Sequence, residues 1–327
     1  MRQLLALGLL APLVLAGCST NSAAASPAES SNAAASANTP EPTAPAPPSS
    51  MVLPHIDGEK AYDYTRQVVS FGPRYLGSAG HAKVEQYLRS KLKGDDPVED
   101  SFTMQTPVGP KPMRNFIAKF PGTKAGIVVV AGHYDTLYGR DDFVGANDGG
   151  ASTGILLAIA DQLRSQMRGK KLDGYSVWLV WLDAEEAIKQ WSDTDSIYGA
   201  RHLADKWKND GTAPQIKAFI LEDMIGDKDL GTEDEGNSSP ELRKIVYQAA
   251  TQLGVQSHFF VRQNAMEDDH LAFKKVGIPV VDLIDYNYGY NNSYWHTADD
   301  TMDKISPQSL QMVGDVTLLT IRLLAQR

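Results

Sequence analysis

The feature that most constrains the fold is an apolar run that ends abruptly in acidic residues. Residues 177–182 read VWLVWL and are followed by Asp183, Ala184, Glu185 and Glu186. The run is typical of a β-strand buried on both faces. Open α/β sheets bind ligands beyond the carboxyl ends of their strands, and adjacent residues leaving a strand point to different sides. One glutamate is therefore predicted to bind a metal and the other to carry protons. Helix capping is the alternative, but it does not require two consecutive glutamates.

Strands alternate with helices along residues 51–327, which fit a single α/β domain by size. This order predicts a mostly parallel, mixed central sheet with helices on both faces. Besides 177–182, the predicted strands are 98–106, 115–120, 126–131, 217–221 and 278–284. The predicted helices are 57–71, 79–92, 150–166, 240–253 and 307–325.

The first fifty residues carry no predicted globular structure. Residues 1–18 combine one arginine, an apolar run and a small-residue end, which is typical of a signal peptide. The end, LAGC, resembles the lipobox of bacterial lipoproteins, and Cys18, the only cysteine, is the predicted lipidation site. Residues 19–50, rich in Ala, Ser and Pro, are predicted to form a disordered tether. We therefore expect a lipid anchor to a membrane of the cell envelope, on the periplasmic side or at the cell surface.

Polar side chains that can bind metal follow other predicted strands. His133, Asp223 and His296 each come after a strand, and Asp148 lies in a glycine-rich loop that leads into a helix. With Glu186 they offer the histidine and carboxylate ligands that suit zinc. Taken singly, Asp148 can be a helix cap and His133 a hydrogen-bonded histidine beneath the site. Their convergence at strand ends favours a metal site. Four further histidines are interpreted as ordinary polar or core residues: His55, His81, His202 and His258.

The motifs HYD, ANDGG, DAEEA, LEDMIG, EDDH and WHT follow one another in an order that resembles the zinc aminopeptidase superfamily. Within that superfamily the chain resembles the animal-type glutaminyl cyclases (glutaminyl-peptide cyclotransferases) most closely. The pattern WS-x-x-DS-x-YG-x-RHLA at 191–204 carries much of the resemblance, together with Asp-Asp-His at 268–270 and Trp-His-Thr at 295–297. The resemblance covers about residues 71–300 and implies a zinc aminopeptidase-like fold.

The resemblance implies one zinc ion bound by three residues: Asp148, Glu186 and His296. It makes Glu185 the general base and acid, with Asp223 and Asp268 as a hydrogen-bonded carboxylate pair beside it. Trp191 and Trp295 are then expected to wall the substrate pocket.

The chain also departs from the animal cyclases. Residues 147–151 are closer to the peptidase form of this loop, Asp282 stands where the animal enzymes usually have histidine, and 286–294 is unlike the animal loop. His133 belongs to the cyclase pattern without being a ligand there.

The leading hypothesis is a zinc-dependent glutaminyl cyclase that converts the N-terminal glutamine of peptides to pyroglutamate and releases ammonia. The alternative is a two-zinc aminopeptidase, in which His133 and Asp223 bind the second metal and Asp148 bridges both. A catalytically silent binding protein is a third possibility. The net charge of −9 argues against a nucleic-acid partner.

Overall fold

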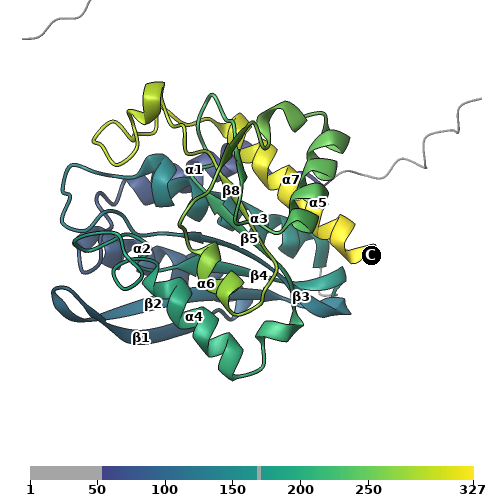
Figure 1. The fold of residues 1–327 in the computed structure, drawn as a ribbon, viewed down its shortest axis with the longest axis horizontal. Helices are drawn as coiled ribbons and strands as arrows, with labels where there is room; N and C mark the ends of the chain where they lie inside the picture. The colour runs from purple at the N-terminus through teal and green to yellow at the C-terminus, as the bar shows by residue number, and fades with distance from the viewer. Residues whose placement is uncertain (1–53, 168–170) are drawn as a thin grey trace, which may run out of the picture. The chain divides into compact units, whose positions relative to one another are not determined.

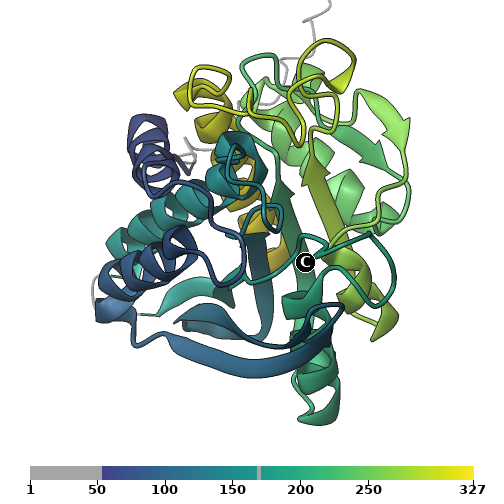
Figure 2. The same ribbon diagram turned by 90° about the vertical axis from the view of Figure 1, so that its left-hand side faces the viewer.

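A six-stranded sheet lies at the centre of the fold in the computed structural model, with the strand order β1-β2-β4-β3-β5-β8 (Figure 1). The strands are β1 (Val98–Thr106), β2 (Gly109–Phe120), β3 (Gly122–His133), β4 (Leu172–Leu182), β5 (Ile216–Asp223) and β8 (Val280–Ile284). Strands β4, β3, β5 and β8 run parallel, whereas β1 and β2 pair antiparallel and β2 joins β4 antiparallel. In Figure 2 the two blue antiparallel strands lie low in the picture. The predicted mixed, mostly parallel sheet is confirmed.

Helices cover both faces of this sheet. One face carries α1 (Gly58–Val69), α2 (Ala79–Leu92), α3 (Ser152–Met167), α5 (Pro240–Leu253) and α7 (Pro307–Ala325). The other carries α4 (Tyr198–Asn209) and α6 (His270–Lys275). Each face of the sheet has its own hydrophobic core, and strand β3 contributes to both. Val128 and Val130 belong to the core under α1, α2, α3, α5 and α7, whereas Val129 and Ala131 belong to the core under α4 and α6. Side chains that alternate along a strand point to opposite faces, so one layer of strands separates the two cores.

Local signals explain several helix ends. Ser306 caps α7 by accepting a hydrogen bond from the Ser309 N–H, and Pro307 occupies the first helical turn. Helix α5 ends at Gly254, whose φ of 74° lies in the left-handed region that glycine favours. Helix α3 begins at Ser152, two residues after the predicted start, because an irregular π-helical segment (Ala146–Ala151) precedes it. That segment carries Asp148.

The structure describes residues 54–167 and 171–327. The predicted signal peptide, Cys18 and the tether lie outside the described residues. Val52–Arg327 forms one compact unit. Among the described helices, none is both long and apolar enough to cross a membrane. A short parallel pair, β6 (Glu233–Glu235) and β7 (Arg262–Asn264), stands apart from the main sheet.

Candidate metal centre

The carboxyl ends of the parallel strands bring the predicted metal-binding residues together. His133 ends β3, Asp223 ends β5, and Glu186 follows β4 after a short turn. Asp148 reaches the same place from the segment before α3, and His296 from the loop after β8. Two groups with metal-binding spacing result, Asp148–Glu186–His296 and His133–Asp148–Asp223, and they share Asp148. The structure therefore places all five predicted residues at one site.

The spacing within these groups fits zinc. His296 Nε2 lies 3.3 Å from Asp148 Oδ2 and 3.4 Å from Glu186 Oε1. A tetrahedral ion with bonds of about 2.0–2.1 Å separates its ligand atoms by about 3.3 Å. Glu186 Oε1 is buried and finds no hydrogen-bond partner within the part of the chain that the structure describes. A bound cation would satisfy this oxygen, so the residues present fit a zinc ion.

The second group shows similar distances. His133 Nε2 lies 3.1 Å from Asp148 Oδ1 and 3.2 Å from Asp223 Oδ1. His133 is almost fully buried, and its Nδ1 lies 3.5 Å from Asp135 Oδ1. This arrangement suits either a histidine hydrogen-bonded beneath the metal or a ligand of a second ion. The structure describes no hydrogen bond between Asp223 and Asp268, whose charges nevertheless interact.

Charge in the site calls for a cation. Burial alone would lower the pKa of His296, but Asp148 and Glu186 raise it to about 10. Burial raises the pKa of Glu186 to about 7, and the nearby Asp148 adds to the rise. Both directions reflect negative charge concentrated in a buried place, where a metal ion would be strongly attracted.

Glu185 lies beside the metal group in a different electrostatic setting. It is buried and lines a pocket with Asp268, and burial raises its pKa well above the ordinary value. His133 opposes this rise, while Glu186 and Asp268 add to it. A carboxyl group tuned in this direction can both accept and return a proton near neutral pH.

The pocket over the site has a volume of about 430 Å³. Trp191 and Trp295 line it as predicted. The Trp295 ring stacks on His296 at 3.9 Å between ring centroids, and its edge contact with Tyr286 is at 5.1 Å. The Trp191 Nε1–H donates a hydrogen bond of 3.0 Å to Glu267. Aromatic side chains thus wall an opening whose floor is acidic.

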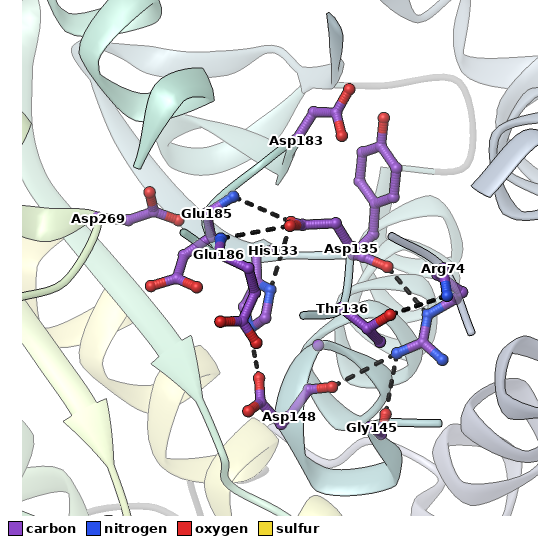
Figure 3. A network of polar contacts seen from close by, with 12 residues as sticks. Arg74, His133, Asp135, Thr136, Gly145, Asp148, Asp183, Glu185, Glu186 and Asp269 are labelled. Atoms are coloured by element: carbon purple, nitrogen blue, oxygen red, sulfur yellow. Dashed lines mark hydrogen bonds and ion pairs between the residues drawn. The ribbon is translucent and has the colours of Figure 1, made fainter. Parts of the chain in front are cut away.

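Asp135 fixes the turn that carries both glutamates. Its carboxylate accepts hydrogen bonds from the Glu185 N–H at 3.0 Å and the Glu186 N–H at 3.3 Å, as Figure 3 shows. Ile197 N–H donates to the Glu185 carbonyl at 2.7 Å from the other side. Asp135 belongs to the HYD motif, but its role as an acceptor for the backbone was not predicted.

Asp183 anchors the start of the same turn. It is fully buried and accepts hydrogen bonds from the Arg114 N–H at 2.7 Å. His81 Nε2 lies 2.7 Å from its other oxygen. His81, interpreted from the sequence as an ordinary polar or core residue, is a buried polar residue, and through Asp183 it supports the start of this turn.

A buried arginine and a buried aspartate hold the loop that bears Asp148. Arg74 donates to the carbonyls of Tyr134 at 2.9 Å and Gly145 at 2.9 Å, and more weakly to that of Asp148 at 3.4 Å (Figure 3). Asp300 accepts from the Asp148 N–H at 3.1 Å and from the preceding N–H.

Several residues of the site adopt left-handed backbone conformations that side chains with a Cβ atom disfavour. The φ angles are 53° at Ala184, 51° at Met224 and 56° at His296. Each residue lies in a turn that directs a ligand or catalytic side chain into the site. The surrounding hydrogen bonds hold these conformations at a cost of about 1–2 kcal/mol each.

Known proteins show the same fold and sequence pattern. The family model described as peptidase family M28 matches residues 115–321. A glutaminyl-peptide cyclotransferase of Drosophila melanogaster is 30% identical over 277 residues, covering 77% of this chain and 76% of that protein. The crystal structure of an Acidobacteriales bacterium glutaminyl cyclase is 46% identical with a TM-score of 0.82, covering 87% of this chain and all of that one. A Zn-dependent exopeptidase from Parabacteroides distasonis is 26% identical with a TM-score of 0.71, covering 84% and 100% of the two chains.

Proposed function

The chain belongs to peptidase family M28 and, within it, to the glutaminyl-peptide cyclotransferases, and we propose that it cyclises the N-terminal glutamine of peptides to pyroglutamate. The observation that carries the proposal is the buried carboxyl of Glu185 beside a complete zinc-binding group, at the floor of an aromatic pocket. The substrate class follows from the cyclase relatives, which match most of the folded domain.

In this proposal Asp148, Glu186 and His296 bind one zinc ion. Their spacing fits tetrahedral zinc, and the similar exopeptidase is described as Zn-dependent. When bound, zinc supplies a Lewis acid that polarises the carbonyl of the glutamine side-chain amide. With a cation bound, the Glu186 carboxylate would stay ionised, although burial raises its pKa.

Glu185 transfers the proton that the reaction must move. The α-amine of the peptide attacks its own side-chain carbonyl, a C–N bond forms, and the bond to the amide nitrogen breaks. Glu185 takes a proton from the attacking amine and gives it to the departing nitrogen, which leaves as ammonia. No proton is gained or lost overall. Burial, together with the negative charges of Glu186 and Asp268, keeps this carboxyl's pKa high, and burial and Asp223 in turn raise the pKa of Asp268.

The pocket contributes mainly through positioning. The reaction is intramolecular, so its acceleration depends on folding the glutamine side chain back onto its own amine. Trp191 and Trp295 provide rigid aromatic walls for that compact conformation. Trp295 is itself held by its stacking on His296, which connects the wall to the metal group.

The N-terminal segment supports a location for this enzyme. The LAGC sequence, with Cys18 as the single cysteine, and the long Ala/Ser/Pro-rich tether are the features of a lipid-anchored protein. In this proposal the catalytic domain works at the outer side of a membrane of the cell envelope, on peptides or proteins that begin with glutamine.

Mass spectrometry of peptides tests the reaction directly. A glutamine-initiated peptide incubated with the purified protein should lose one ammonia and keep its length. Glu185→Gln should abolish the product while retaining zinc, because it removes the proton carrier and leaves the ligands in place. Release of the first residue from glutamine- or leucine-initiated peptides would instead establish the aminopeptidase activity and refute the proposal.

A further inference from the structure

Three exposed side chains form the mouth of the pocket. Of the residues that line it, only Lys189, Gln190 and Glu267 are exposed to solvent. The proposed reaction uses none of them. A glutamine folded onto its own amine lies near the acidic floor, and the peptide that follows it has to leave through the mouth. The second residue of a substrate therefore passes these three side chains.

Glu267 has a fixed position at this mouth. Its Oε2 accepts the hydrogen bond of 3.0 Å from Trp191 Nε1–H, so the carboxylate is attached to one wall of the pocket. The backbone before it is held as well, because the Met266 N–H donates to Glu235 at 3.1 Å and the Met266 carbonyl accepts from Asn237 Nδ2 at 3.1 Å. A group fixed in this way loses little conformational freedom when a substrate contacts it.

The Glu267 carboxylate has no cationic partner within the chain. No basic side chain among residues 54–167 and 171–327 forms an ion pair with it, and its hydrogen-bond donor is an uncharged indole. An unpaired carboxylate beside the path of a substrate attracts a cationic group on that substrate. The net charge of −9 adds a long-range attraction for cationic peptides.

Lys189 is the opposing charge at the mouth. Asp195 holds its backbone N–H at 2.9 Å, but its ammonium group forms no ion pair in the described part of the chain. This ammonium is strongly hydrated and lies at the end of a flexible four-carbon side chain. Ordering that side chain against a substrate costs conformational entropy, whereas Glu267 is already held. The fixed carboxylate therefore outweighs the lysine in selecting the second residue.

We propose that Glu267 selects peptides that carry lysine or arginine immediately after the N-terminal glutamine. This inference rests on the proposed cyclase function and names the class of peptide on which that site acts. The second residue does not react, so its contact with Glu267 is the same in the bound substrate and in the transition state. Such a contact lowers KM and leaves kcat unchanged.

Three amidated peptides test this preference, each beginning with glutamine and differing only at the second residue. That residue is lysine, its uncharged acetyl derivative or glutamate. For the wild type, KM should be about 2–5-fold lower with lysine than with acetyl-lysine, the range of a solvent-exposed ion pair, and highest with glutamate. The preference should weaken in high salt, which screens exposed charges.

Glu267→Gln should abolish the preference for lysine without changing kcat or zinc content. The amide oxygen of the variant can still accept the hydrogen bond from Trp191, so the wall keeps its position. Glu267→Lys should reverse the preference. Glu241→Gln is the matched control, since it removes the same charge from an exposed position in α5, away from the residues that line the pocket. It should keep the wild-type preference.

The same KM ratio in the wild type and Glu267→Gln would overturn the proposal. A wild-type preference for glutamate would also overturn it and assign the selection to Lys189. An equal loss of preference in Glu241→Gln would attribute the effect to net charge, which again refutes a contact with Glu267.

Failure of this inference can be told from failure of the proposed function. Pyroglutamate from all three peptides with one common KM would refute only the role of Glu267, whereas no pyroglutamate from any of them would refute the proposed function. In the second case, dissociation constants from calorimetry still test the contact. The wild type should bind the lysine peptide about 2–5-fold more tightly than Glu267→Gln does, and equal affinities would refute the inference.

Discussion

Substitution of Asp135 by asparagine removes one acceptor from the turn that positions Glu185 and Glu186. The carboxylate uses both oxygens, one for each glutamate N–H, at 3.0 and 3.3 Å. An asparagine has one carbonyl oxygen and one NH₂ group. Whichever way the amide is turned, one of the two glutamate N–H groups faces another donor. The side chain keeps its volume, so the change is electrostatic.

The magnitude follows from those two contacts. A hydrogen bond to a charged group contributes about 1.5–3 kcal/mol, and a buried donor left without an acceptor costs about 1–3 kcal/mol. We take about 2 kcal/mol as the free-energy cost of losing one of these hydrogen bonds and misplacing Glu185. If the whole cost appears in the activation free energy, kcat falls about 30-fold. Zinc affinity should fall by about 10–100-fold, as for other residues that orient metal ligands.

The assay pairs ammonia release with a zinc competition titration against a chromogenic chelator. Asp195→Asn is the control, because Asp195 is a buried carboxylate that accepts hydrogen bonds from Ile188, Lys189 and Gln190 N–H at 2.9–3.0 Å. Of these, Lys189 and Gln190 line the pocket, and none of the three belongs to the metal-binding groups. The control should raise KM and leave zinc affinity unchanged. If Asp135→Asn lowers the melting temperature yet keeps zinc affinity and kcat, the positioning argument is wrong.

Four further outcomes are expected. His133→Ala should keep the zinc content of the wild type and slow cyclisation by about 10–100-fold through disturbed hydrogen bonding; loss of one zinc would instead indicate a two-metal centre bridged by Asp148. His296→Ala should abolish cyclisation with little change in melting temperature, because the large core rather than the metal stabilises the domain; a collapse of the melting temperature would contradict this. Cys18→Ser should move activity from the membrane to the soluble fraction, and activity that stays with the membrane would argue against the lipid anchor. Burial alone would raise the pKa of Asp195, but hydrogen bonds from Gln190 N–H and the Tyr198 hydroxyl lower it. The ionised Asp195 therefore stabilises the fold above the pKa that this group has in the unfolded chain, and this stabilisation is lost as the pH falls through the lower pKa of the folded state. The difference in unfolding free energy between the wild type and Asp195→Asn should accordingly shrink from pH 6 toward pH 3.

The sheet could be predicted because each strand has a local sequence signal, a short run of apolar residues. The strand Val98–Thr106 and the helices Pro240–Leu253 and Pro307–Ala325 match the predictions at both ends. Helices α4 and α6 were not predicted. Helix α6 has only six residues, too few for a helical period to show. Helix α4 begins inside the motif at 191–204 and runs on to Asn209, and it starts after Ile197, which provides no side-chain cap to mark the helix start.

The convergence of the predicted metal ligands could be expected for a related reason. His133 and Asp223 end parallel strands, Glu186 closely follows another, and parallel strands bring their ends to one edge of the sheet. The supporting residues could not be found in this way. Arg74 contacts carbonyls 60 to 74 positions later in the chain, and Asp300 contacts a backbone N–H 152 positions earlier. Only the folded chain shows such pairings, since no local pattern encodes them.

The left-handed conformations at Ala184, Met224 and His296 have a consequence for how this protein can evolve. A lineage selected only for heat resistance could relieve the strain at Ala184 by placing glycine there, at the loss of one methyl group. Met224 offers no such gain, because its side chain is buried with Ile284 and Tyr288 and glycine would leave a cavity. A glycine at position 184 would loosen the turn that aims Glu185, so thermal fitness and turnover would be traded against each other. His296 allows no such exchange, because glycine has no side chain to bind the metal. At position 296 the backbone strain therefore cannot be removed without losing a predicted metal ligand.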